Sequence, residues 1–137
     1  MRILGMDLGE KRIGLAVSDE LVITAQGLPT LKRKEIKEDL QQLVEIIKEK
    51  QISKLVVGLP KNMNGTLGFQ AEKVKKFVDL LIEEYPLEVV YWDERLTTVA
   101  AQRTLLESDV SRKKRKKAVD RIAAVMILQG YLNRMKY

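Results

Sequence analysis

The sequence from residue 3 to residue 18 reads ILGMDLGEKRIGLAVS. Ile3 to Leu8 is a short apolar run of the kind that forms a buried strand, and Ile13 to Ser18 is a second run of this kind. The residues between them include Gly9-Glu10-Lys11, which is typical of a tight turn. We therefore predict that the chain starts with an antiparallel hairpin.

Beyond the hairpin, strand-like and helix-like segments alternate. Residues 21–31 are predicted to form a third, edge-like strand, because this segment contains Gly27 and Pro29. Amphipathic or apolar helices are predicted over residues 35–50, 70–84 and 118–135, a further helix from Thr97-Thr98 to Leu106, and strands over residues 54–59 and 88–92. Strands that are separated by helices pair in parallel. The expected fold is an α/β sheet, a three-stranded meander followed by parallel strands, with helices on both faces.

Composition restricts the kinds of chemistry that are open to this chain. It has 137 residues, which fits a single domain over residues 1–137, with a net charge of +6 and neither His nor Cys. The absence of Cys excludes disulfides and thiol catalysis, and the absence of His removes the usual general base at neutral pH. A basic protein favours polyanionic partners.

The start of the chain does not have the pattern of a signal peptide, because its apolar run is interrupted at Asp7. No stretch of the sequence approaches the length of a membrane span. We expect a cytoplasmic protein without a membrane partner.

Three carboxylates occupy positions where a charge is costly to bury. Asp7 lies in the first apolar strand, Glu94 lies at the end of the last strand, and Asp120 lies in an almost wholly apolar helix. Buried charges are tolerated mainly when they are paired or bound to a metal, and carboxylates suit hard ions such as Mg²⁺ or Mn²⁺. If the fold brings these three residues together, they form a metal site.

Each carboxylate also has an ordinary structural explanation. Asp7 can hydrogen-bond to its turn, Glu94 can complement the dipole of the following helix, and Asp120 can pair with Lys116 or Lys117. A fourth acid, Asp19, is interpreted as a turn residue.

Two further groups of residues are candidates for contacts with a ligand. Six consecutive cations adjoin Asp120 and could hold a phosphate backbone, or could form a solvated loop: Arg112, Lys113, Lys114, Arg115, Lys116 and Lys117. Arg95 beside Glu94 is a candidate of the same kind. Since ligands gather at the carboxyl ends of parallel strands, the expected site-lining residues are Gly9, Gly58, Pro60, Asn62 and Thr97.

Together, these segments resemble the YqgF family, also called RuvX, of relatives of Holliday-junction resolvases. The resemblance covers essentially the whole chain. It rests on the segments Gly5-Met6-Asp7-Leu8-Gly9, Gly58-Leu59-Pro60-Lys61-Asn62-Met63-Asn64-Gly65, Asp93-Glu94-Arg95-Leu96-Thr97-Thr98, and Asp120 with Ala123-Ala124 and Ile127-Leu128-Gln129-Gly130-Tyr131-Leu132.

The resemblance implies a ribonuclease-H-like fold with a five-stranded mixed sheet. The family's three acidic active-site positions match Asp7, Glu94 and Asp120. It implies a metal-dependent nuclease that uses Mg²⁺ or Mn²⁺ and acts on RNA in maturation of the pre-16S ribosomal RNA, with the ribosome or its precursor as a partner. The alternative within the family is a DNA resolvase of the Holliday-junction type.

Two readings from other functional classes stay open. The basic run fits a non-catalytic nucleic-acid or ribosome-associated binding protein equally well. Asp7-Leu8-Gly9 followed by Gly14 also resembles the first phosphate loop of ATP-handling proteins of the actin, hexokinase and Hsp70 type. Those proteins place the nucleotide between two such domains and this chain has room for one, so no nucleotide cofactor is expected.

Overall fold

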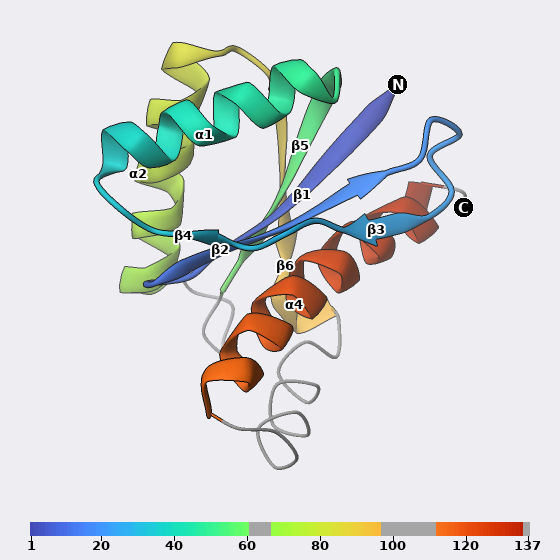
Figure 1. Cartoon of the computed structure of the whole chain (residues 1–137). Helices are drawn as coiled ribbons and strands as arrows, with labels where there is room; N and C mark the ends of the chain where they lie inside the picture. Colours follow the sequence, from blue (N-terminus) through green and yellow to red (C-terminus); the bar gives the residue numbers. More distant parts are fainter. Residues whose placement is uncertain (61–66, 97–111, 136–137) are drawn as a thin grey trace.

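The computed structural model describes residues 1–60, 67–96 and 112–135, apart from the side chains of Arg95 and of residues 112–121 (Figure 1). Its elements in chain order are β1 (Arg2–Leu8), β2 (Arg12–Ser18), β3 (Ala25–Gly27), β4 (Leu31–Lys32), α1 (Ile36–Glu49), β5 (Ile52–Leu59), α2 (Phe69–Glu84), β6 (Glu88–Asp93), the 3₁₀ turn η1 (Glu94–Leu96) and α4 (Arg112–Met135).

The strands form one mixed sheet in the order β3-β2-β1-β5-β6, with β4 also paired to β2. β1 is antiparallel to β2 and parallel to β5, and β5 is parallel to β6. The predicted hairpin and the predicted parallel strands are therefore confirmed. The prediction of one strand over residues 21–31 is wrong, because this segment forms two short strands on either side of Pro29, which has no amide hydrogen to donate to a sheet.

The two faces of the sheet carry separate apolar layers. Successive side chains of a strand point to opposite faces, so Leu4 and Met6 of β1 pack with α1 and α2, whereas Ile3 packs with α4. Figure 1 shows α1 and α2 on one side of the sheet and α4 on the other. The predicted helices on both faces are confirmed. Within the described residues, no helix is both long enough and apolar enough to span a bilayer.

Helix α4 packs against β1 at very short range. A Cβ atom added to Gly5 would lie 2.7 Å from the Cβ of Leu128 and 3.1 Å from the carbonyl oxygen of Ala124. Further along α4, the hydroxyl of Tyr131 accepts a 2.9 Å hydrogen bond from Nζ of Lys54, which raises the pKa of this lysine. Lys54 is paired with Ile3 in the sheet, so Tyr131 lies level with the start of β1, whereas Ala124 and Leu128 lie at Gly5 further along the strand. Helix α4 therefore runs antiparallel to β1, and its N-terminal half lies toward the carboxyl end of β1.

Two details of the predicted helices are wrong. In the helix predicted over residues 35–50, helical spacing places Ile36 on the apolar stripe with Leu40 and Leu43, but Ile36 is the first residue of α1 and is exposed. The last helix is predicted to begin at residue 118, with the basic run as a polar connector before it, but residues 112–117 form the first turns of α4. Lys and Arg are good helix formers, so a run of charges need not be a loop. The helix predicted to end at Leu106 lies outside the described residues.

Candidate active site

Asp7 lies near the end of β1, on the face of the sheet that α4 covers. It follows Ile3 and Gly5 at intervals of two residues, and both of those residues contact the α4 layer. The side chain of Asp7 is buried, with an exposed fraction of 5% for the residue. The burial of Asp7 confirms the expectation from the sequence that this carboxylate occupies a position where a charge is costly to bury.

Glu94 approaches the same face from β6. The strand ends at Asp93, and η1 then turns the chain so that the half-buried Glu94 side chain reaches over β5. A Cβ atom added to Gly58 would lie 2.8 Å from Oε1 of Glu94 and 2.4 Å from Cδ1 of Ile127. Gly58 therefore leaves the space in which this carboxylate sits.

The register of the sheet brings these two acids close together. Met6 of β1 is level with Val57 of β5, so the next residues, Asp7 and Gly58, are neighbours across adjacent strands. Strands pair at about 4.8 Å. Because a Cβ atom at Gly58 would meet the Glu94 carboxylate, this carboxylate lies over the strand next to Asp7, on the same face of the sheet.

The third predicted acid, Asp120, belongs to α4. It precedes Ala124 by four residues, which is one helical turn toward the end of the sheet that carries Asp7 and Glu94. The side chain of Asp120 lies outside the described residues. The described side chains contain no group of three or more acids, His or Cys that could hold a metal ion. The three-carboxylate site therefore stays a prediction.

The other predicted site residues divide into two groups. Gly9 and Pro60 follow β1 and β5, at the same end of the sheet as Asp7. Asn62 and Thr97 lie outside the described residues, as do the side chains of Arg95 and of the basic run at residues 112–117. Asp19 is a turn residue, as expected, and accepts hydrogen bonds from the amides of Thr24 and Ile23, which lower its pKa.

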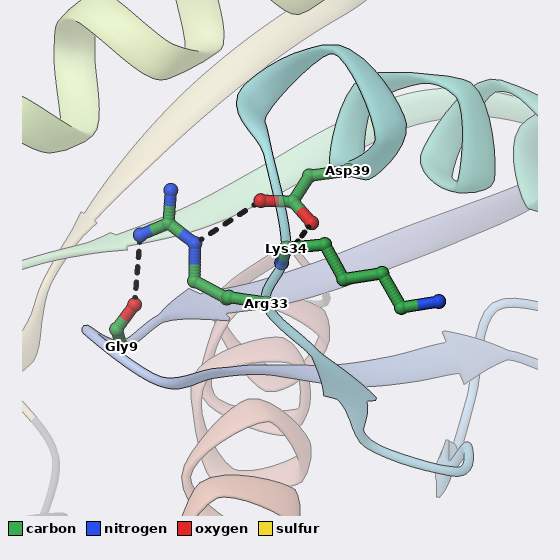
Figure 2. Close-up of polar contacts among 4 residues, drawn as sticks. All are labelled: Gly9, Arg33, Lys34 and Asp39. Atoms are coloured by element: carbon green, nitrogen blue, oxygen red, sulfur yellow. Dashed lines mark hydrogen bonds and ion pairs between the residues drawn. The ribbon is translucent and has the colours of Figure 1, made fainter.

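The turn after Asp7 is held by a residue that the sequence did not single out. Nη1 of Arg33 donates a 3.0 Å hydrogen bond to the carbonyl oxygen of Gly9, and its Nε lies 3.4 Å from Oδ2 of Asp39 (Figure 2). The other oxygen of Asp39 accepts a 2.9 Å hydrogen bond from the amide of Lys34. The Arg33 guanidinium also lies 5.3 Å from the ring centroid of Phe77 on α2.

This cluster joins the segment from Arg33 to Asp39 with Gly9 of the β1–β2 turn and Phe77 of α2. No pattern within one segment therefore indicates the whole cluster. The one available signal was Asp39 itself, which is an acid among the apolar residues of α1 and is only 1% exposed. A buried carboxylate on a helix is costly unless a cation or a hydrogen-bond donor pairs with it. Its partner, Arg33, lies in the charged run from Lys32 to Glu35. Runs of charged residues are usually solvated, so this one does not indicate a buried ion pair.

We expect Asp39→Ala to lower the free energy of unfolding by about 2–3 kcal/mol, because it leaves the Arg33 side chain and the Lys34 amide without their acceptor. The matched control is Glu38→Ala, an exposed acid in the same helical turn, which should change stability by less than about 0.5 kcal/mol. Urea denaturation of both variants measures the difference. Equal stabilities would contradict a structural role for the Arg33–Asp39 pair.

Comparison with proteins of known sequence identifies close relatives. A protein from Clostridioides difficile named "Putative pre-16S rRNA nuclease" is 61% identical over 132 residues, which cover 96% of this chain and 94% of that protein. A protein of the same name from Clostridium tetani is 56% identical over 133 residues, covering 97% of this chain and 96% of that protein.

Solved structures show the same fold at low sequence identity. RuvC of T. thermophilus in complex with a Holliday junction substrate matches with a TM-score of 0.62 at 14% identity, over 99% of this chain and 96% of that chain. The fowlpox virus resolvase in its complex with Holliday junction DNA matches with a TM-score of 0.59 at 13% identity, over the full length of both chains. These likenesses confirm the predicted ribonuclease-H-like fold.

The family model described as "RuvX: Holliday junction resolvase" matches residues 1–134. This match agrees with the names of the sequence relatives and confirms the resemblance that the motifs around Asp7, Gly58, Glu94 and Asp120 indicated. The chain belongs to the RuvX family.

Proposed function

We propose that this chain is a metal-dependent nuclease that cleaves phosphodiester bonds of RNA during maturation of the pre-16S ribosomal RNA. The observation that carries the proposal is the pair of carboxylates at the ends of β1 and β6, with Glu94 seated over Gly58 beside the buried Asp7. The names of the sequence relatives support the nuclease activity and the choice of RNA. The cytoplasm is the expected location.

The residues at this site fit a divalent ion by the chemistry of their donor atoms. Carboxylate oxygens are the preferred ligands of Mg²⁺ and Mn²⁺, and a chain without His or Cys has few other ligands to offer. We propose that the three carboxylates of Asp7, Glu94 and Asp120 jointly bind the ions. When bound, such ions activate water and offset the negative charge that develops on the phosphate.

The protein's own contribution is to hold these oxygens in place. Gly58 provides the space for the Glu94 carboxylate, and the close packing of α4 on Gly5 sets the position of the helix that carries Asp120. Preorganised charge of this kind needs little rearrangement during the reaction. We propose that Arg95 and the basic run at residues 112–117 hold the phosphodiester backbone beside the site, with Gly9, Pro60, Asn62 and Thr97 lining it.

A DNA resolvase is the second candidate, because the description of the family model and the solved structures with this fold concern Holliday junctions. A shared fold is a weak argument for a shared substrate. RNA is favoured because the sequence relatives share far more of their residues with this chain.

A cleavage assay distinguishes these functions. Its substrates are single-stranded RNA, structured RNA that resembles a ribosomal precursor, duplex DNA and a four-way DNA junction. Each is incubated with Mg²⁺, with Mn²⁺ and with EDTA. We expect cleavage of RNA that EDTA abolishes. Metal-dependent cleavage of the junction alone would instead establish the resolvase. Binding without cleavage of any substrate would establish a non-catalytic nucleic-acid binding protein.

A further inference from the structure

A second concentration of positive charge lies away from the basic run of α4. The β1–β2 turn and the segment from β4 to α1 together line a pocket of about 420 Å³, which we call the basic groove. It is lined by Glu10, Lys11, Arg12, Lys32, Arg33 and Lys34. Five of these six residues are cations.

Backbone pairing holds these cations together. Arg12 of β2 is directly opposite Lys32 of β4, and the amide of Arg33 donates a 2.9 Å hydrogen bond to the carbonyl oxygen of Lys11. Like charges that face each other across a sheet repel and lower stability. The groove is therefore an arrangement that an anion would stabilise.

The charges of the groove are largely uncompensated. Arg33 is paired with Asp39, but in the described part of the chain Lys11, Arg12, Lys32 and Lys34 form no ion pair within 4.0 Å. The single acid of the groove, Glu10, accepts a 3.4 Å hydrogen bond from Gln70 of α2. Lys11, Lys32 and Lys34 are exposed and can reach a ligand.

The groove adjoins the proposed active site through the turn that follows β1. Gly9 is two residues beyond Asp7, and its carbonyl oxygen is bonded to Arg33 of the groove. A second pocket of about 380 Å³ shares Glu10 and Arg33 with the groove and is also lined by Gly9 and by Lys73 of α2. The positive surface thus lies beside the end of the sheet that carries Asp7.

We propose that the basic groove binds backbone phosphates of the nucleic-acid substrate at a distance from the bond that is cleaved. This inference rests on the proposed nuclease function and adds a contact region that is separate from the helix with the basic run. The Arg33–Asp39 pair holds the shape of the groove, and the exposed lysines supply the charge. A competing explanation is that Lys32 of the short edge strand β4, with Lys34 beyond it, merely prevents pairing with another chain.

The test compares two variants that lose the same charge. Lys32→Gln/Lys34→Gln removes two exposed cations of the groove. Lys48→Gln/Lys50→Gln removes two cations at the other end of α1, a helix of 14 residues and hence about 20 Å long. Binding of a fluorescently labelled single-stranded RNA is measured by anisotropy, in EDTA to prevent cleavage, from about 50 to about 200 mM KCl.

We expect the groove variant to bind RNA at least about tenfold more weakly at about 0.1 M salt. The negative slope of log K, the association constant, against log[KCl] should decrease in magnitude by about 1.4, which corresponds to two lost phosphate contacts on a single strand. The control should match the wild-type protein. In cleavage assays with Mn²⁺, the groove variant should raise KM and leave kcat unchanged. The melting temperatures of both variants should equal that of the wild type.

Two results would overturn the proposal in distinguishable ways. If the wild-type protein binds and cleaves RNA while the groove variant binds as well as the control, the groove is an edge-protecting surface and the nuclease assignment stands. If the wild-type protein binds neither RNA nor a four-way DNA junction, the groove proposal and the proposed function fail together.

Discussion

Asp7→Asn is expected to reduce metal-dependent cleavage by about 100- to 1,000-fold, the range observed when an active site loses one preorganised electrostatic contact. Asparagine keeps the shape of the side chain but removes the negative charge that holds a divalent ion. Asp7 is buried on the face of the sheet that Glu94 reaches. The rate of product formation at saturating Mn²⁺ measures the effect.

The control for this variant is Asp79→Asn, the same change at an exposed position of α2. It should leave the cleavage rate unchanged. A second readout that does not depend on activity is the rise in melting temperature on addition of Mn²⁺, because a ligand that binds only the native state stabilises it. The rise should occur in the wild type and in Asp79→Asn but not in Asp7→Asn. Undiminished cleavage by Asp7→Asn would remove this residue from the active site.

Gly58→Ala is expected to reduce cleavage by about 100-fold or more and to destabilise the fold by about 1–3 kcal/mol. The added methyl group would lie 2.8 Å from Oε1 of Glu94 and 2.4 Å from Cδ1 of Ile127. Both groups must move, and a carboxylate that is displaced by about 1 Å no longer has the geometry for catalysis. Urea denaturation and cleavage assays measure the two effects.

A second substitution separates these two effects of Gly58→Ala. Adding Ile127→Val removes the Cδ1 atom that the new methyl group approaches and leaves the contact with Glu94 in place. The double variant should therefore recover stability, less the cost of about 0.5–1.5 kcal/mol for Ile→Val itself, without recovering cleavage. Recovery of activity together with stability would show that the loss came from the fold and not from Glu94.

Much of this fold could be predicted because its signals are local. The buried strands β1, β2 and β5 are short apolar runs, and α1 and α2 carry apolar residues at helical spacing, so each segment indicates its own structure. The predictions failed where a local signal was ambiguous. The edge strand divides at Pro29, and the basic run is helical although its charge pattern is that of a loop.

Only part of the candidate site and its surroundings could be predicted from the sequence, for a related reason. Asp7 and Glu94 could be found because an acid at the end of an apolar strand is costly and therefore informative. The basic groove could not, because strand pairing brings Lys11 and Arg12 together with Lys32, Arg33 and Lys34. The Arg33–Asp39 pair could not, because its two residues are only six positions apart but show no spacing that indicates a contact. Charged residues at a surface show no periodicity that would indicate their partners.

The sequence by itself determined the family, the order of strands and helices, and the identity of the acids on which the proposed chemistry rests. The tertiary structure decided that Glu94 lies over Gly58, beside Asp7, and that α4 lies against Gly5. These relations depend on the parallel register of β1, β5 and β6 and on the absence of side chains at two glycines. Register and close packing depend on contacts between distant segments, which no single segment encodes.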